Sequence, residues 1–498
     1  MRRGWLTFFS LLLVTGSLQA EQAPSGPALD DIFLWLAGGI SSARIQRLAG
    51  TDTGGLACRI TSPCIRALRN AGADPALIQN LAGQSTTHQE ATAQSQQQKS
   101  AAGASCNCAS AAVEVAALVH DKNLEAAEGK VHNLLRDDPQ NASLLFVLGM
   151  ILRRQERFDE ALDAFTESLH LMPSFAETHS QLSYLFYRTD DSDYALSEAR
   201  TALSMDPGNA EAYRYLGLAL YADGHYDAAL NAFAKSLERE PENADVYFDM
   251  GIAERDKGDL RLAAIAYRHA LSLRPDFWQA HSNLGVVLRD QGKLDEAVAE
   301  YRIAIRLKPD EASVRNNLGN TLCDKEDFDN AIVEFKELYR HTPEWESGHN
   351  CLARAYMSKG DYPAAILELH MAIAANPAGA AEQRVLGQAL LLSGKNKEAI
   401  DVLRKAVSLN PESSLAHRYL GTALANTQQF AAAEKEFREA LRLEPNAQNH
   451  YSLAACLMAL DHYEEALGEL EIASRLDPKE NLYRARMQEA ARMITTSK

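Results

Sequence analysis

Small, large apolar and helix-breaking residues recur along most of this chain at one fixed interval of 34 residues. Each interval ends in proline, and an alanine stands twelve residues before that proline. The prolines are Pro139, Pro173, Pro207, Pro241, Pro275, Pro309, Pro343, Pro377, Pro411 and Pro445, with Pro478 following at 33. The alanines are Ala127, Ala161, Ala195, Ala229, Ala263, Ala297, Ala331, Ala365, Ala399, Ala433 and Ala466. An interval kept over so many residues predicts a repeat array.

Each interval predicts two antiparallel helices. In the interval that ends at Pro275, we expect helices over 244–256 and 260–273 with a turn at 257–259 between them. A glycine seventeen residues before the proline suits the left-handed residue that closes a helix, and five intervals carry it: Gly224, Gly258, Gly292, Gly360 and Gly394. The proline then ends the second helix. Because a single pair of helices cannot bury its apolar face, neighbouring pairs must stack.

Two further positions predict how the helices of a pair meet. The residue twenty-four positions before the proline is small: Gly149, Gly217, Gly251, Gly285, Gly319, Gly387 and Gly421, with Ser183, Ala353 and Ala454 as substitutes and Val115 as the exception. The residue eight positions before the proline is large and apolar in most intervals: Phe165, Phe233, Tyr267, Tyr301, Phe335, Leu369, Leu403 and Phe437. We expect the small residue where the helices approach closely, and the large one to fill the remaining space.

This period and signature resemble the tetratricopeptide repeat across residues 108–480. The resemblance implies an all-α solenoid of about eleven helix-turn-helix repeats, wound as a right-handed superhelix. It also implies that the first helix of each repeat lines a concave groove, where an extended segment or a helix of a partner protein lies. No catalytic residue, cofactor or metal follows from it.

The parts outside the array predict four more segments. Residues 1–20 have the pattern of a secretory signal peptide, with Arg2 and Arg3 before a short apolar run. That run is shorter than the roughly 20 residues that span a bilayer, so we expect cleavage, export to the periplasm or the exterior, and no integral membrane segment afterwards. Residues 28–83 predict a small helical module, which resembles one found before repeats in other bacterial proteins. Residues 84–107 predict a flexible linker and 481–498 a helix that caps the last repeat.

The seven cysteines leave several pairings open. In an exported protein, Cys58 and Cys64 suggest a disulfide, with two buried free thiols as the alternative. Cys106 and Cys108 could pair with them instead, or all four could bind zinc, although their spacing is unusual for a zinc site. Cys323, Cys351 and Cys456 fall in first helices, where we expect small core or groove residues.

Composition and motifs argue against nucleic-acid binding and against catalysis. The 67 Asp and Glu residues outnumber the 50 Lys and Arg residues, which favours solubility and disfavours a nucleic-acid partner. The sequence has no phosphate-binding loop, nucleophile elbow, H-E-x-x-H motif or calcium loop. His341, His349 and His370 form the densest histidine set, but no acidic residue sits among them at metal-ligand spacing, so we expect solvated or groove positions. The sequence therefore predicts a protein without enzyme activity.

The resemblance places groove residues about 20, 23, 26 and 27 positions before each proline. Early repeats give an aromatic set that includes Phe146 and Met150, and middle repeats give amides and arginines. We select as the partner-binding groove Tyr184, Tyr187, Tyr215, Tyr221, Arg255, Asn283, Arg289, Asn316, Asn317, Asn320, Asn350 and Arg354. Amides can hydrogen-bond the backbone of an extended peptide, and arginines can hold carboxylates. The alternative is that these polar residues only keep the surface hydrated.

The function predicted from the sequence is a scaffold or adaptor for protein–protein interaction, with one or more protein partners. The alternative is an accessory subunit of an envelope enzyme, or of a complex that modifies or exports polysaccharide.

Overall fold

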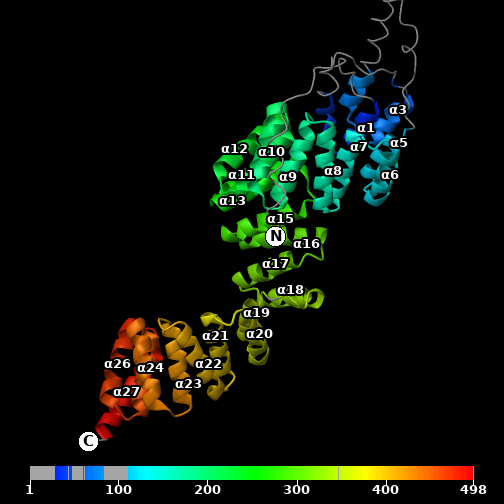
Figure 1. Ribbon diagram of the computed structural model, residues 1–498. Helices are drawn as coiled ribbons and strands as arrows, with labels where there is room; N and C mark the ends of the chain where they lie inside the picture. The colour runs from blue at the N-terminus through cyan, green and yellow to red at the C-terminus, as the bar shows by residue number, and fades with distance from the viewer. Residues whose placement is uncertain are drawn as a thin grey trace, which may run out of the picture. The chain divides into compact units, whose positions relative to one another are not determined.

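The computed structural model describes residues 29–42, 44–46, 60, 62–82, 110–345 and 347–496, and every regular element among them is an α-helix. Eleven helix pairs follow one another in these residues, as predicted (Figure 1). The pairs are α5 (Ala111–His120) with α6 (Leu124–Asp137), α7 (Ala142–Arg154) with α8 (Phe158–Leu171), α9 (Ala176–Arg188) with α10 (Ser192–Met205), α11 (Ala210–Ala222) with α12 (Tyr226–Arg239), α13 (Ala244–Lys257) with α14 (Leu260–Leu273), α15 (Trp278–Asp290) with α16 (Leu294–Leu307), α17 (Ala312–Asp324) with α18 (Phe328–His341), α19 (His349–Ser358) with α20 (Tyr362–Ala375), α21 (Ala380–Leu392) with α22 (Asn396–Leu409), α23 (Ser414–Asn426) with α24 (Phe430–Leu443), and α25 (Ala447–Ala459) with α26 (Tyr463–Leu476).

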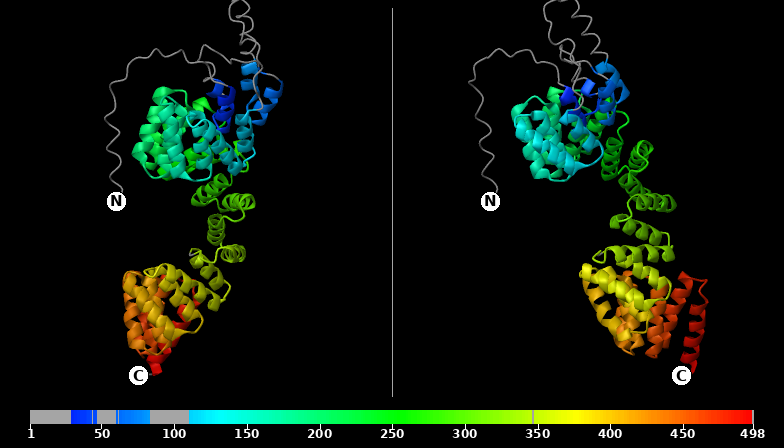
Figure 2. Two further views of the ribbon diagram at one scale, coloured as in Figure 1. Left: turned by 45° about the vertical axis from the view of Figure 1, so that its right-hand side comes forward. Right: turned by 90° about the vertical axis from the view of Figure 1, so that its right-hand side faces the viewer.

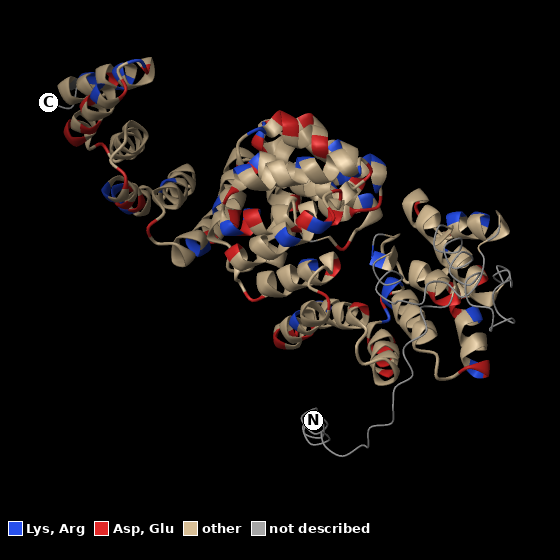
Figure 3. Ribbon diagram, turned by 90° about the horizontal axis from the view of Figure 1, so that it is seen from above, with Lys and Arg blue, Asp and Glu red and all other residues tan. Residues whose placement is uncertain are grey.

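The chain forms two compact units, Met1–Asp249 and Met250–Lys498, with the boundary inside α13. Within each unit, consecutive helix pairs stack side by side (Figure 2). Figure 3 shows acidic and basic residues interspersed along the described helices. The second unit ends in α27 (Asn481–Thr496), which packs against α26 and buries Ala490.

The small and large positions of each repeat meet as the sequence predicts. All eleven alanines twelve residues before a proline have an exposed fraction of 0%. A Cβ atom added to Gly217 would lie 2.4 Å from the Phe233 ring, and one added to Gly251 would lie 2.5 Å from the Tyr267 ring. Ser183 takes the glycine position of its repeat, where the facing residue is Ala199, and its hydroxyl donates to the Ala195 carbonyl at 2.8 Å. A larger residue on one helix is thus matched by a smaller one on the other.

The turn inside each pair holds one residue in the left-handed region. Glycine occupies it in the five predicted intervals, with φ between 74° and 98°. The other six intervals use Lys122, Glu156, Asp190, Glu326, Gln428 and Asp461, with φ of 60° to 63°. The next residue's amide then bonds the carbonyl five residues back, as from His225 to Leu220 at 2.9 Å, which satisfies a carbonyl at the helix end.

The N-terminal module packs against the first repeats of unit 1. Helix α1 (Leu29–Ala37) contacts α5 and α7, and Trp35 lies 6.1 Å from Phe175 between ring centroids. The module also contains α3 (Ser62–Asn70) and a helix over 75–82, whose start is capped by the Asp74 carboxylate at 2.7 Å from the Leu77 amide nitrogen. The predicted signal peptide and the predicted linker lie outside the described residues.

This packing corrects one sequence expectation. Phe146 and Met150 were expected in the open aromatic set, but their exposed fractions are 0% and 3%. Both belong to one apolar cluster with Phe33 and Trp35 of α1. The module, whose position the repeat pattern does not encode, covers this part of the first-helix surface.

The cysteines give a second correction. Cys323 of α17 and Cys351 of α19 form a disulfide with their Cα atoms 6.1 Å apart, so they link adjacent repeats rather than acting as separate small core residues. Cys456 is a buried free thiol, as expected. Cys64 is disulfide-bonded, while Cys58, Cys106 and Cys108 lie outside the described residues.

The repeat that contains α19 is irregular at its start. Helix α19 has 10 residues, whereas α17 and α21 have 13 each. Gly348 precedes it with φ of 97°, close against Phe335. The Tyr339 hydroxyl donates to the Ser347 carbonyl at 2.9 Å, and the Tyr339 ring stacks on His349 at 4.7 Å. The loop at 347–348 thus takes the place of the first turn of α19.

Candidate functional site

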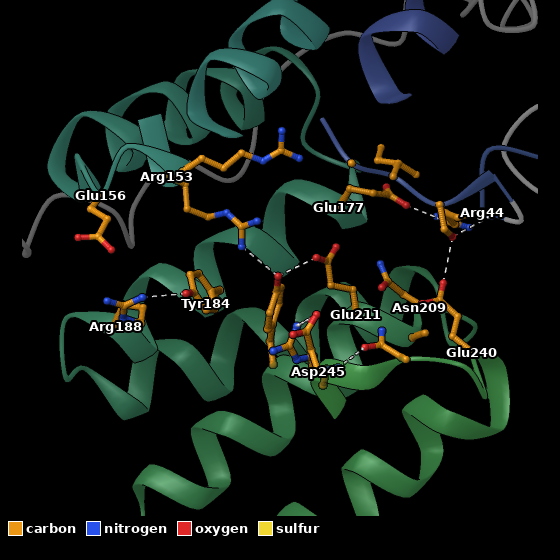
Figure 4. Close-up of a pocket in the computed structure, with 18 residues that line it drawn as sticks. Arg44, Arg153, Glu156, Glu177, Tyr184, Arg188, Asn209, Glu211, Glu240 and Asp245 are labelled. Atoms are coloured by element: carbon orange, nitrogen blue, oxygen red, sulfur yellow. Dashed lines mark hydrogen bonds and ion pairs between the residues drawn. The ribbon is translucent and has the colours of Figure 1, made fainter. Parts of the chain in front are cut away.

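A polar cavity of about 490 Å³ lies in unit 1, between the end of α1 and the first helices of several repeats (Figure 4). Helices α7, α9 and α11 and the start of α13 supply most of its walls. It is lined by Gly39, Ile40, Ser41, Arg44, Arg153, Arg154, Glu156, Glu177, Tyr184, Arg188, Asn209, Ala210, Glu211, Arg214, Tyr215, Glu240, Asn243 and Asp245. Five arginines and five carboxylates therefore face one small volume.

The N-terminal module closes one side of this cavity with polar contacts. The Ser41 hydroxyl donates to the Glu240 carboxylate at 3.0 Å. Arg44 forms ion pairs with Glu177 and, at 2.9 Å, with Asp206. The Arg44 and Glu177 side chains are 15% and 4% exposed, so the pair is largely shielded from water, and removing either partner would leave the other charge buried without a counter-charge.

Tyr215 is at the centre of a buried network on the opposite wall. Its hydroxyl donates to Glu211 at 2.6 Å and accepts from Arg153 at 3.1 Å. Burial raises the pKa of Tyr215, so the phenol stays neutral. Arg214 pairs with Asp249 at 2.6 Å. Burial alone would lower the pKa of Arg214, but the Asp249 carboxylate outweighs it and raises that pKa. These contacts pair the polar groups of this wall with one another.

Two of the four predicted tyrosines line the cavity. Tyr184 and Tyr215 lie 5.1 Å apart between ring centroids, on the neighbouring helices α9 and α11. Tyr187 lies 6.4 Å from Tyr184. Tyr221 packs against Tyr226, 5.8 Å away. Tyr215 is 2% exposed, so it supports the wall more than it offers a free surface.

The remaining predicted residues lie in unit 2. Arg255 is on α13, and the others are on first helices that pack in sequence, α15 against α17 and α17 against α19. Four already have partners. Arg255 pairs with Asp256 at 2.8 Å and Arg289 with Asp324 at 2.7 Å. Asn316 accepts from the Ser347 hydroxyl at 3.3 Å, and Asn350 donates to Glu382 at 2.8 Å.

The other four predicted residues of unit 2 have open side chains. Asn283, Asn317 and Asn320 are half-buried, and Arg354 is exposed. Within the described residues, these four side chains form no hydrogen bond or ion pair. We call Asn283, Asn317, Asn320 and Arg354 the amide surface.

Comparison with known families settles what kind of array this is. A model described as tetratricopeptide repeat matches residues 117–174, 248–312, 283–345 and 352–414. Two further models with the same description match residues 390–453 and 210–243. This chain is a tetratricopeptide repeat (TPR) protein. Scaffolds of this family are typically non-enzymatic and mediate contacts between proteins.

Several solved structures are similar to parts of this chain. MamA is 26% identical over 33% of this chain and 97% of its own, with a TM-score of 0.29. YrrB, described as a TPR protein with an unusual peptide-binding site, is 24% identical over 40% of this chain and 98% of its own, with a TM-score of 0.32. A chain of the APC/C hetero-tetramer Cut9–Hcn1 is 16% identical over 92% of this chain and 96% of its own, with a TM-score of 0.40. A search of curated proteins found no significant match.

Sequence reasoning missed a recurrent contact inside the TPR repeats. Five histidines near the start of first helices each bond a glutamate nineteen residues later on the second helix, at 2.5 to 2.7 Å. The pairs are His179–Glu198, His281–Glu300, His349–Glu368, His417–Glu436 and His450–Glu469. The expectation that His349 is solvated or in a groove was therefore wrong, since it is 7% exposed and bound to Glu368. Aligning the repeats on their prolines places every pair at the same two positions, which is the signal that could have revealed them.

Two other kinds of site are absent from the part of the chain that the structure describes. No group of three or more histidine, cysteine, aspartate and glutamate residues there is arranged to hold a metal ion. No described helix has both the length and the apolar character needed to cross a membrane.

Proposed function

We propose that this TPR protein is a scaffold that holds an extended segment of a partner protein on the amide surface of unit 2. The observation that carries the proposal is that Asn283, Asn317 and Asn320 are half-buried yet have no side-chain partner within the described residues. A half-buried amide that bonds nothing in its own chain is a group whose hydrogen-bonding capacity is left for water or a ligand.

The chemistry of these side chains suits a peptide backbone. Each amide offers a donor and an acceptor, which is what one peptide unit of an extended segment presents in return. Because α15, α17 and α19 pack in sequence, their side chains occur at successive steps of the array. Arg354, on the third of these helices, adds a planar cation that can hold a carboxylate bidentately. Such a surface would recognise the backbone of the bound segment more than its side chains.

The test is affinity capture with the full chain as bait. The variant carries Asn283→Ala, Asn317→Ala and Asn320→Ala together. The matched control carries Asn133→Ala and Asn231→Ala, which change exposed amides on the second helices α6 and α12. We expect a partner that the parent and the control retain and the triple variant loses, with unchanged melting temperatures. If the triple variant retains the same proteins as the parent, the amide surface is not the binding site.

We further propose that the protein is exported, as the pattern of residues 1–20 suggests. The Cys323–Cys351 disulfide and the disulfide-bonded Cys64 support this, because disulfides persist mainly in oxidising compartments. Cell fractionation combined with thiol labelling tests it. A cytoplasmic protein whose Cys323 and Cys351 label without prior reduction would contradict the proposal.

A further inference from the structure

The cavity of unit 1 contains three arginines that no carboxylate of the described residues neutralises directly. Arg153 donates to the Tyr215 hydroxyl and lies over the Tyr184 ring at 4.9 Å. Arg188 donates to the Tyr184 hydroxyl at 2.9 Å. Arg154 forms no hydrogen bond or ion pair within the described residues. All three line the same cavity, from the adjacent helices α7 and α9 (Figure 4).

The carboxylates of the cavity are mostly engaged elsewhere. Glu177 is held by Arg44, Glu240 accepts from Ser41, and Glu211 accepts from Tyr215 and from Gln181 at 3.0 Å. Asp245 lies 4.0 Å from Arg214. Glu156 is exposed in the turn that follows α7 and forms no ion pair with the three arginines. No carboxylate of the described residues thus forms a direct ion pair with these three arginines, although Glu211 favours the charge of Arg153 at longer range and through the Tyr215 hydroxyl.

Two of the three arginines of this wall, Arg154 and Arg188, are exposed. Arg153 is half-buried, and its Nε atom is buried without a hydrogen-bond partner. Although Arg154 is exposed as a residue, the surrounding protein and the neighbouring Arg153 charge lower its pKa, and the Glu211 carboxylate offsets this only in part. A buried cationic donor without an acceptor is costly, so an anion that enters the cavity would relieve this cost.

We propose that this cavity binds the carboxylate group of a ligand through Arg153, Arg154 and Arg188. Guanidinium groups match the planar geometry of a carboxylate and bind it through two parallel hydrogen bonds. A cavity of about 490 Å³ has the volume of a small-molecule or short-peptide site. Because the lining holds as many acidic groups as arginines, we expect carboxylate groups, which carry one negative charge each, to fit it better than a single phosphate group that carries two. This site is separate from the amide surface, which lies in the other unit.

The same carboxylate chemistry can come from an acidic protein segment or from a free organic acid, and the experiment distinguishes the two. Isothermal titration calorimetry on the full chain uses three probes: an amidated tetra-aspartate peptide, citrate and inorganic phosphate. We expect saturable binding of the peptide or of citrate, weakened by added salt because the contact is ionic. The probe that binds more tightly identifies the source of the carboxylate.

Single substitutions locate the binding site. We expect Arg154→Gln and Arg188→Gln each to weaken binding at least tenfold. Neither arginine forms a salt bridge within the described residues, so the fold should stay intact, which circular dichroism checks. The matched control is Arg136→Gln, an exposed arginine on α6 outside the cavity, which should leave affinity unchanged.

Three results would overturn the proposal. They are the absence of binding of both carboxylate probes to the parent, tighter binding of phosphate than of either probe, and equal weakening by Arg136→Gln and Arg154→Gln. The Asn283, Asn317 and Asn320 variant serves as a further control, since it should bind the carboxylate probe normally. Failure of either proposal can thus be recognised separately.

Discussion

The contact between Gly217 and Phe233 can be tested by adding one methyl group. The Cβ atom of a Gly217→Ala variant would lie 2.4 Å from the nearest atom of the Phe233 ring, which is 0% exposed. Overpacking of this kind costs about 1–3 kcal/mol. Alanine also favours the helix over glycine by about 1 kcal/mol, so the methyl clash and the helix propensity oppose each other.

A second glycine separates the two effects. Gly468 lies inside α26, and an added Cβ would meet nothing within 4 Å. Gly468→Ala should therefore show the propensity gain alone. We expect Gly217→Ala to be less stable than Gly468→Ala by about 1–3 kcal/mol. Urea denaturation, followed by circular dichroism, measures the free energy of unfolding of both variants beside the parent.

A compensating change completes the test. In the repeat of Ala353 the facing residue is Leu369, and both are 0% exposed, so alanine and leucine fit together at these positions. The double variant Gly217→Ala with Phe233→Leu should lose less stability than the sum of its single variants, because the leucine makes room for the methyl group. If Gly217→Ala stabilises the protein as much as Gly468→Ala does, our account of the helix contact is wrong.

Four further predictions concern the repeats. Ala297→Leu should destabilise the protein by about 1–3 kcal/mol, because Ala297 is 0% exposed; an unchanged melting temperature would contradict the packing described. Gln428→Gly should stabilise the protein by about 1 kcal/mol, because Gln428 has φ of 63°, in the left-handed region that glycine adopts at lower cost. Equal denaturation midpoints for parent and variant would show that this turn is unstrained. Burial alone would lower the pKa of His281, but Glu300 and the Pro275 carbonyl raise that pKa above its ordinary value. The contribution of the His281–Glu300 pair to the stability of the protein is therefore complete below the unfolded pKa of about 6.5, and it is lost as the pH rises through the folded pKa. His281→Gln should therefore flatten the fall in melting temperature above that pH, and parallel curves for parent and variant would argue against this pair as the cause. Burial raises the pKa of Cys456 to about 11, so its thiol should react with Ellman's reagent only after denaturation, and rapid reaction of the native protein would contradict its burial.

The repeat architecture could be predicted from the sequence because its physical causes recur every 34 residues. The small residue at Gly251 and the large one at Tyr267 are local partners within one repeat, so their spacing alone indicates their contact. The predicted helix over 244–256 ends one residue short of α13, whose last residue is Lys257. Because each repeat places its small and its large residue at the same spacing, the pattern in one repeat predicts the contact in the others.

The features that the sequence did not reveal depend on contacts between the N-terminal module and the repeats, which share no periodic pattern. Nothing in the module indicates that Arg44 pairs with Glu177 or that Ser41 reaches Glu240. The cavity exists because of these contacts, so its arginines could not be selected in advance. The Cys323–Cys351 disulfide was missed for a different reason, since the two cysteines occupy different positions within their repeats.

The docking of the N-terminal module has a consequence for the order in which the chain assembles. Contacts within a TPR pair join residues close in sequence, as His281 and Glu300 do at a separation of 19. The module instead depends on distant partners, 133 residues away for Arg44 with Glu177 and 199 for Ser41 with Glu240. Because contacts of long sequence separation form slowly, the N-terminal module is synthesised early but completes its packing late. Its contact with Glu240 cannot form until the fourth helix pair of the array has been synthesised.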